Sequence, residues 1–199
     1  ARRMGNEYLY QILARQNIET LDRYGVKKIV TLCPHCLNTI KNEYPHLGGR
    51  YEVRHYSELV AELIDLGKIR PAVTLDTDLT YHDSCYLGRH NGVYDPPRRI
   101  AEAIPGVRLV EMERRRERGF CCGAGGGHLW MEESRGERVS HVRTEQFLET
   151  GGDTIGVSCP YCLQMFTEAI DAKGLGGEKQ AKDLLEVLAE SLGDADQES

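Results

Sequence analysis

The residues of this chain that could carry chemistry are its seven cysteines. They lie in short motifs separated by long stretches: Cys33, Cys36, Cys85, Cys121, Cys122, Cys159 and Cys162. Thiolates that converge from separate loops are the ligands that iron–sulfur clusters use. An odd number of cysteines fits poorly with a closed disulfide framework, and a chain of 199 residues can form a core without disulfides. The pattern therefore predicts a metal site in a reducing, cytoplasmic setting.

The last five cysteines form a set that could hold a cluster by itself. Cys85 stands alone, 35 residues separate it from Cys121 and Cys122, and 36 residues separate that pair from Cys159 and Cys162. Iron in clusters prefers soft thiolate ligands, usually four of them. Two adjacent cysteines can bind two different irons. These five residues are therefore predicted as metal ligands.

A glycine-rich loop follows the adjacent cysteines. Gly123, Gly125 and Gly126 are predicted to bind the cofactor, because glycine lets the backbone come close and its N–H groups can point at sulfide. The loop lacks the lysine and hydroxyl residue of a phosphate-binding loop, so nucleotide binding is not expected.

The chain also repeats itself. Shifted by 126 residues, the sequence lies on itself without a gap, so that Cys33 falls on Cys159 and Cys36 on Cys162. The match continues downstream, where residues 59–67 fall on 185–193. A repeat of this length decides the architecture. We expect residues 1–70 to be the second half of a first module and residues 71–199 to be a complete second module, with the first half of the first module in a longer parent protein.

Strands and helices alternate along the chain. Apolar periodicity and turn residues predict helices at 5–24, 37–44, 57–66 (capped by Ser57), 96–104, 133–150, 163–173 and 182–192. Short apolar runs predict strands at 26–32 (buried), 51–56, 79–83, 107–112 and 154–158. This order predicts an α/β fold with small, mainly parallel sheets flanked by helices. Cys33, Cys85 and Cys159 then lie just past strand ends, where ligands gather in such sheets.

Two blocks carry a family resemblance. They are Tyr81-His-Asp-Ser-Cys-Tyr-Leu-Gly-Arg89 and Phe120-Cys-Cys-Gly-Ala-Gly-Gly-Gly127, and with the two Cys-Pro-x-Cys motifs they extend over nearly the whole chain. The pattern resembles the cysteine-rich CCG domain found in heterodisulfide reductase and in the iron–sulfur component of glycolate oxidase. It is most similar to the C-terminal part of membrane-bound oxidoreductases that pass electrons from electron-transfer flavoprotein to menaquinone.

The resemblance implies tandem Rossmann-like modules related by a pseudo-twofold axis. It implies a [4Fe–4S] cluster, of the non-cubane kind found in heterodisulfide reductase, on the five cysteines of the second module. Cys33 and Cys36 would serve a second cluster in the longer parent. The implied partners are electron-transfer flavoprotein or another flavoprotein dehydrogenase, a quinone, and a membrane anchor outside this chain. The implied place is the cytoplasmic face of the cell membrane, and this chain alone would not be catalytically competent.

Three rival functions remain open. The first is disulfide reduction at the cluster, as heterodisulfide reductase performs. The second is dithiol chemistry, because Cys-Pro-x-Cys motifs also occur at helix starts in thioredoxin-like proteins. The third is structural zinc, which could also replace iron, although zinc ribbons place their cysteine pairs about 15–20 residues apart.

Charge and the remaining polar residues narrow the partners. The net charge of −6 argues against nucleic acid. His82 and Asp83 either act near the cluster or fix the loop before Cys85, and the second reading is favoured. The charged run 113–118 is either a solvated surface or a docking site for an acidic flavoprotein.

Overall fold

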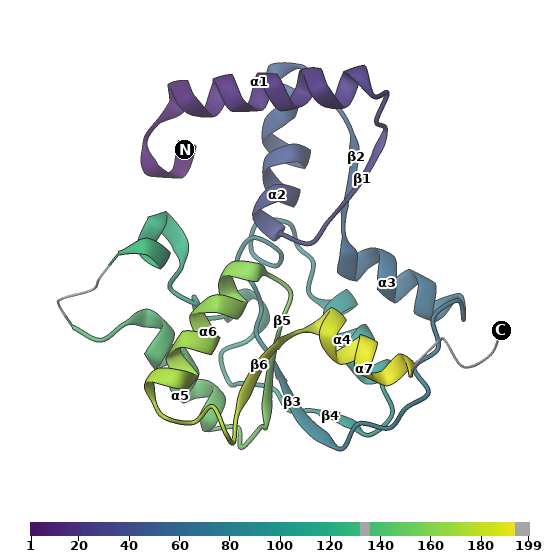
Figure 1. The fold of residues 1–199 in the computed structure, drawn as a ribbon, viewed down its shortest axis with the longest axis vertical. Helices are drawn as coiled ribbons and strands as arrows, with labels where there is room; N and C mark the ends of the chain where they lie inside the picture. Colours follow the sequence, from purple (N-terminus) through teal and green to yellow (C-terminus); the bar gives the residue numbers. More distant parts are fainter. Residues whose placement is uncertain (132–135, 194–199) are drawn as a thin grey trace.

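The chain folds into two parallel β-sheets surrounded by helices (Figure 1). The computed structural model describes residues 1–131 and 136–193. The strands are β1 (Lys28–Thr31), β2 (Glu52–His55), β3 (Thr77–Tyr81), β4 (Val107–Leu109), β5 (Thr154–Val157) and β6 (Gln180–Asp183). The α-helices are α1 (Glu7–Arg23), α2 (Pro34–Asn38), α3 (Tyr56–Asp65), α4 (Asp95–Ala103), α5 (Val139–Leu148), α6 (Pro160–Ala172) and α7 (Leu184–Leu192).

Shorter helical segments join these elements. They are η1 (Arg2–Met4), the π-helix η2 (Thr39–Glu43), η3 (Tyr44–Leu47), η4 (Arg116–Arg118) and η5 (Gly125–Trp130). Over the described ranges, no helix combines the length and the apolar character that crossing a membrane requires.

The larger sheet has four parallel strands in the order β4-β3-β5-β6. Helices α5 and α6 cover one face, and α4, α7 and α3 lie against the other (Figure 1). Phe147 and Phe166 pack with Ile155 on the first face, and Leu79 packs with Ile100 on the second. Strand β5 is buried along its whole length because it lies between two strands and two helix layers. This confirms the predicted α/β fold with parallel sheets flanked by helices.

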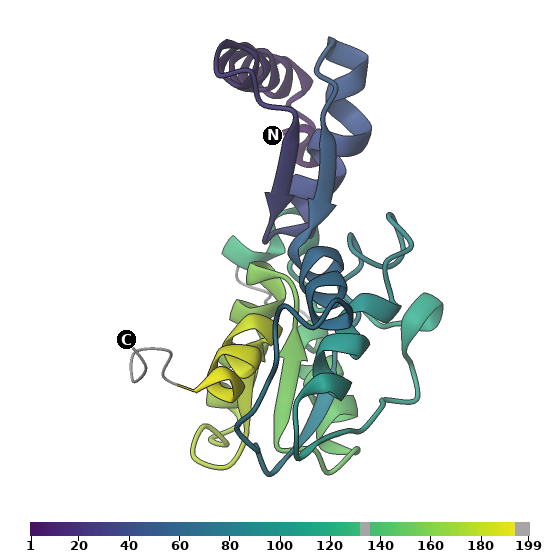
Figure 2. The same cartoon turned by 90° about the vertical axis from the view of Figure 1, so that its right-hand side faces the viewer.

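The smaller sheet pairs β1 with β2 in parallel and stands apart from the larger one (Figure 2). The sequence predicted a buried strand here, and that was wrong. Val30 and Leu32 are 51% and 61% exposed. The reason is topological: β1 occupies the position of β5 in the repeat, but within the described residues it pairs only with β2, so one edge stays open.

The internal repeat is present in the fold. β1 and β5 begin 126 residues apart, and so do α2 and α6 (160 − 34 = 126). Both helices begin in the same way: Cys33 and Cys159 are the N-cap residues, and Pro34 and Pro160 stand in the first turn. Proline is favoured there because its missing N–H would have no partner in the helix. The predicted strand-to-helix turn at each Cys-Pro-x-Cys motif is therefore confirmed.

The repeat is not free of gaps, however. The N-caps of α3 and α7, His55 and Asp183, are 128 residues apart, and each forms a capping box with a glutamate, Glu58 or Glu186. β2 and β6 also begin 128 residues apart (180 − 52 = 128). The second copy therefore has two additional residues between the start of α6 and β6. The ungapped match of residues 59–67 with 185–193 was wrong by two residues.

Some local predictions also differ from the structure. β6 was missed, because its segment Gln180–Asp183 carries no apolar alternation and lies at the edge of the sheet. Helix α3 is capped by His55 and not by Ser57. Helix α5 begins at Val139, and part of the helix predicted at 133–150 lies outside the described residues. The strand predicted at 107–112 ends at Leu109.

The cap of α3 predicts a dependence of stability on pH. His55 is fully buried; its Nε2–H donates to the carbonyl of Leu32 (3.2 Å), and its Nδ1 accepts from the amide of Ser57 (3.3 Å). Burial lowers the pKa of His55 to about 4. The unfolded state therefore binds the proton more tightly, and stability falls as the pH drops from about 6.5 towards 4. We expect a loss on the order of 2–3 kcal/mol over this window, measured by urea unfolding of the cluster-free protein. A His55→Gln variant with the same pH profile as the wild type would contradict this account.

Candidate metal centre

The cysteines meet where the strands of the larger sheet end. Cys159 follows β5 after one residue, and Cys85 follows β3 after a short polar segment. Cys121 and Cys122 come from the loop between η4 and η5. The carboxyl ends of parallel strands lie at one edge of the sheet, so loops from three parts of the chain converge there.

The seven sulfurs form one continuous chain of contacts. Cys162 donates to Cys122 at 3.3 Å, and the thiols of Cys122 and Cys121 interact with each other. The contacts run in the order Cys36, Cys33, Cys159, Cys162, Cys122, Cys121, Cys85. All seven are free thiols; Cys122, Cys159 and Cys162 are buried, and Cys36 at one end is exposed. The sequence placed five of them in one site and two in another, and the structure places the two sets in contact through Cys33 and Cys159.

Backbone amides support several of these sulfurs. The amide of Gly123 donates to Cys121 Sγ at 3.3 Å, and the amide of Ala124 donates to Cys122. In both Cys-Pro-x-Cys turns, the amide of the second cysteine donates to the first sulfur. Such hydrogen bonds stabilise negative charge on sulfur, as metal ligation requires.

Gly123 is the loop glycine with both a left-handed backbone and a close neighbour. Its φ is +94°, and an added Cβ would lie 3.1 Å from Val139 Cβ and 3.2 Å from Ser140 N. A larger residue would strain the backbone and push the loop away from α5. Gly125 and Gly126 line an open cleft beside the site.

The two Cys-Pro-x-Cys turns face each other. His35 and Tyr161 occupy the same place in the repeat, and their rings meet edge to face at 5.1 Å. His35 Nδ1 lies 3.8 Å from Cys33 Sγ and 3.9 Å from Cys159 Sγ. The sequence argued against zinc because the two Cys-Pro-x-Cys pairs are far apart along the chain. In the folded protein the two pairs lie close together, so that argument fails. What separates this site from a zinc site is the number of donors, because tetrahedral zinc takes four ligands.

Contact between the thiols lowers the pKa of some of them and raises the pKa of their partners. Hydrogen bonds from neighbouring thiols lower the pKa of Cys33, chiefly through Cys159, and that of Cys121, chiefly through Cys122. Their partners bear the opposite effect: hydrogen bonding to Cys121 raises the pKa of Cys85, and hydrogen bonding to Cys33 raises that of Cys36. Thiolates are therefore favoured at Cys33 and Cys121, and the thiolate is the form that binds metal.

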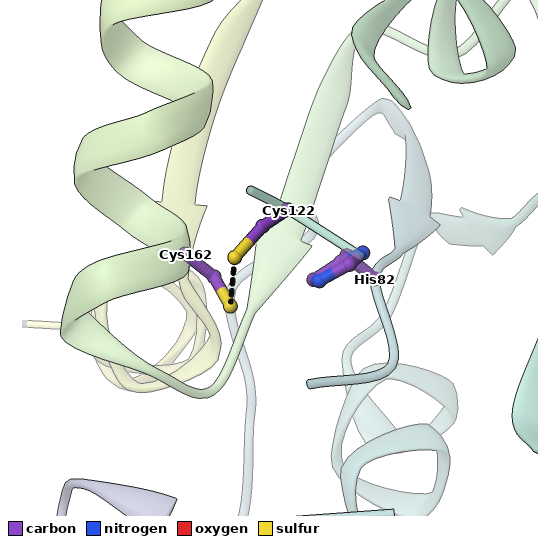
Figure 3. A group of neighbouring side chains, drawn as sticks. All are labelled: His82, Cys122 and Cys162. Atoms are coloured by element: carbon purple, nitrogen blue, oxygen red, sulfur yellow. Dashed lines mark hydrogen bonds between the residues drawn. The ribbon is translucent and has the colours of Figure 1, made fainter. Parts of the chain in front are cut away.

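A buried histidine, His82, lies near the sulfurs of Cys122 and Cys162. One ring nitrogen of His82 and the sulfurs of Cys122 and Cys162 lie within 4.8 Å of one another (Figure 3). The ring is buried edge-on against Phe166, and burial lowers its pKa to about 3. Arg143 Nε donates to His82 Nδ1 at 3.4 Å. Sequence reasoning missed Arg143, since nothing distinguishes it from a surface arginine of helix α5.

Asp83 fixes the loops around the site, as the favoured reading predicted. Its two carboxylate oxygens accept from Arg98 Nη1 (2.8 Å) and Nη2 (2.9 Å). Arg98 is also paired with Glu111. The amide of Arg116 donates to Asp83 at 2.6 Å, and this hydrogen bond holds Arg116 at a φ of +53°. Asp83 thus ties the end of β3 to the loop that leads to Cys121.

The residues present fit an iron–sulfur cluster. Soft donors are more numerous than one metal ion needs, amides point at sulfur, and a buried guanidinium nitrogen, Nη2 of Arg143, has no hydrogen-bond partner among the described residues. Apolar packing by Met165 and Phe166 keeps water from the inner sulfurs.

Comparison with known proteins agrees with this reading. The profile of the CCG cysteine-rich domain matches residues 1–41 and 79–167. The chain is 53% identical over 195 residues to a probable iron–sulfur-binding oxidoreductase, FadF, of Bacillus subtilis (strain 168), covering 98% of this chain and 28% of that protein. It is 46% identical over 199 residues to the EtfAB:quinone oxidoreductase of Syntrophomonas wolfei, covering 96% of this chain and 28% of that protein.

A more distant relative is one component of the dihydromethanophenazine:CoB–CoM heterodisulfide reductase of Methanosarcina barkeri, with 38% identity over 184 residues, 91% of this chain and 44% of that component. The chain thus spans less than half the length of these relatives. By its profile match, its cysteine motifs and these relatives, the chain belongs to the CCG cysteine-rich domain family.

Proposed function

We propose that this chain holds a four-iron iron–sulfur cluster and, within a longer protein, passes electrons between a flavoprotein and a quinone. The observation that supports this most is the convergence of five cysteines, Cys85, Cys121, Cys122, Cys159 and Cys162, in one line of sulfur contacts. When bound, the cluster supplies one-electron transfer. The likeness to an EtfAB:quinone oxidoreductase supports the choice of partners.

The residues around the site have three tasks under this proposal. The five cysteines bind iron. The amides of Gly123 and Ala124 stabilise charge on the sulfurs that they contact. Burial of Cys122 and Cys162 among Met165 and Phe166 excludes water from the inner side. The protein thereby sets the potential of the site and holds it at a fixed distance from a donor or acceptor.

An open cleft of about 450 Å³ beside the cysteines is where we place the redox partner. Aromatic and glycine residues line it, among them His35, Tyr86, Trp130, Tyr161 and Gly126. His35 and Tyr86 lie 4.2 Å apart, and His35 also contacts the Cys33 and Cys159 sulfurs. A planar redox-active ring can stack on such side chains close to the site.

The longer protein supplies the remaining parts of the proposal. We place there the quinone site, the membrane anchor and the other ligands of a second cluster that uses Cys33 and Cys36. We also place the protein at the cytoplasmic face of the cell membrane, and the lipid-soluble quinone supports its contact with the membrane.

A second candidate is reduction of a disulfide substrate at the site. The exposed thiol of Cys36 beside Cys33 supports it, because a substrate can reach this end of the sulfur chain. The likeness to a component of a heterodisulfide reductase is consistent with it.

Metal analysis of anaerobically purified protein separates these functions. We expect iron and sulfide in equal amounts, about four of each per cluster, and a paramagnetic signal on one-electron oxidation or reduction. Stoichiometric zinc without iron would overturn the proposal. A new signal that forms only when a disulfide substrate is added would favour the second candidate.

A further inference from the structure

Arg143 is a fully buried cation whose hydrogen-bond partners carry no charge. Its Nη1 donates to Gln146 Oε1 at 2.6 Å and its Nε donates to His82 Nδ1 at 3.4 Å. Its Nη2 is buried without a partner among the residues that the structure describes. The side chain is 0% exposed, so water does not compensate the charge.

Arg98, on the opposite side of the sheet, is a buried arginine whose charge is balanced by carboxylates. Two carboxylates, those of Asp83 and Glu111, bind its guanidinium. No carboxylate contacts Arg143 within the described ranges. Burial lowers the pKa of Arg143 to about 10, the charges of Asp83 and Cys162 work to raise it, and that of Arg114 to lower it. Arg143 therefore remains charged at neutral pH, and an uncompensated charge in the interior is costly.

The His82 ring links Arg143 to the cysteines, because it accepts from Arg143 and lies near the Cys122 and Cys162 sulfurs. Because Arg143 donates to Nδ1, the proton of the neutral ring must be on Nε2. His82 is packed against Phe166 and cannot easily turn. With Nδ1 occupied by Arg143, the Nε2–H is the donor left for the Cys122 and Cys162 sulfurs, which lie with one ring nitrogen within 4.8 Å (Figure 3).

We propose that Arg143 is the counter-cation of the iron–sulfur site, and that His82 carries its influence to the sulfur pair as a hydrogen-bond donor. The inference rests on the proposed function. A cluster held by thiolates is anionic, and its net charge and the hydrogen bonds to its sulfurs set its potential. Arg143 and His82 are thus positioning residues, which act on the site without binding metal.

The cluster-free protein gives the first half of the test. Without an anion, the charge of Arg143 opposes folding, so Arg143→Leu should melt at the wild-type temperature or above it. Arg98→Leu is the matched control, a buried arginine that is paired, and it should melt well below the wild type. A fall in Arg143→Leu as large as in Arg98→Leu, or failure to fold, would mean that Arg143 has a purely structural role and would overturn the inference.

The loaded protein gives the second half. At the wild-type midpoint potential, the ratio of reduced to oxidised Arg143→Leu protein should be about tenfold lower, a shift of about 59 mV for one electron. Arg143→Lys, which keeps the charge, should stay closer to the wild type, and His82→Phe should shift in the same direction as Arg143→Leu. Wild-type iron content with an unchanged potential in Arg143→Leu defeats the inference alone, whereas absence of iron from the wild-type protein defeats the proposed function.

Discussion

Replacing Cys122 with serine should remove the iron from this protein. Cys122 lies in the middle of the sulfur chain, 3.3 Å from Cys162 and in contact with Cys121. It is almost fully buried, so no water or solvent ligand can take its place. Removing a residue that only supports a metal ligand already lowers metal affinity about 10–100-fold, and removing a ligand itself should lower the affinity more. Iron and sulfide per protein, together with the visible absorbance of the cluster, measure the effect.

Cys36→Ser is the matched control for Cys122→Ser. Cys36 is the exposed end of the same chain of contacts, and its main interaction is with Cys33. We expect this variant, and Cys33→Ser, to keep most of the iron, because five thiols of the second module remain. Equal iron loss in Cys33→Ser and Cys122→Ser would show that the two Cys-Pro-x-Cys pairs share one metal site, which is the arrangement that zinc or a bridging cluster would use.

The parts of this site that the sequence could predict are those fixed by local structure. A β-branched run followed by Cys-Pro requires a strand that ends in a helix start, because proline fits the first turn of a helix and little else nearby. That rule placed Cys33 and Cys159 correctly at strand-to-helix turns, although the helices begin at Pro34 and Pro160, three residues earlier than predicted. The parallel order of strands then brought Cys85 to the same edge of the sheet.

The parts that it could not predict depend on how the two copies pack. The contact of Cys33 with Cys159 joins residues whose motifs are far apart, and no periodicity encodes it. The two additional residues between the start of α6 and β6 were hidden because chance identities continued the ungapped match. Arg143 was missed for a related reason. Its burial follows from the packing of α5 against the site, and a composition rule expects arginine at the surface.

The burial of β1 was misjudged on the same grounds. Its sequence is as apolar as that of a central strand, but a strand is buried only when neighbours cover it. β5 has strands on both sides and helices on both faces, and β1 has one strand partner in the described part of the chain. The apolar composition shows that β1 could be buried, but its place in the sheet decides that it is exposed.

Removing Arg98 should cost this protein about 3–5 kcal/mol of unfolding free energy, the range measured when one partner of a buried ion pair is deleted. In Arg98→Leu, the carboxylates of Asp83 and Glu111 lose their shared cation. The amide of Arg116 would keep Asp83 partly satisfied, so the loop before Cys121 should loosen rather than unfold on its own. Urea unfolding of the cluster-free protein measures the loss.

The neighbouring residue provides the control. Arg99 pairs with Asp65 on the surface, with side chains 46% and 56% exposed, so Arg99→Leu should cost only about 0–1 kcal/mol.

The pH dependence of stability provides a second check. Burial works to raise the pKa of Asp83, but the hydrogen bonds and charge of Arg98 outweigh it and the pKa ends below its usual value. The pair therefore stabilises the fold above the ordinary pKa of aspartate, near 4, and this contribution is lost as the pH falls through the lowered value. Arg98→Leu should lack that acid transition, and an unchanged acid limit would show that Asp83 is held by its other contacts alone.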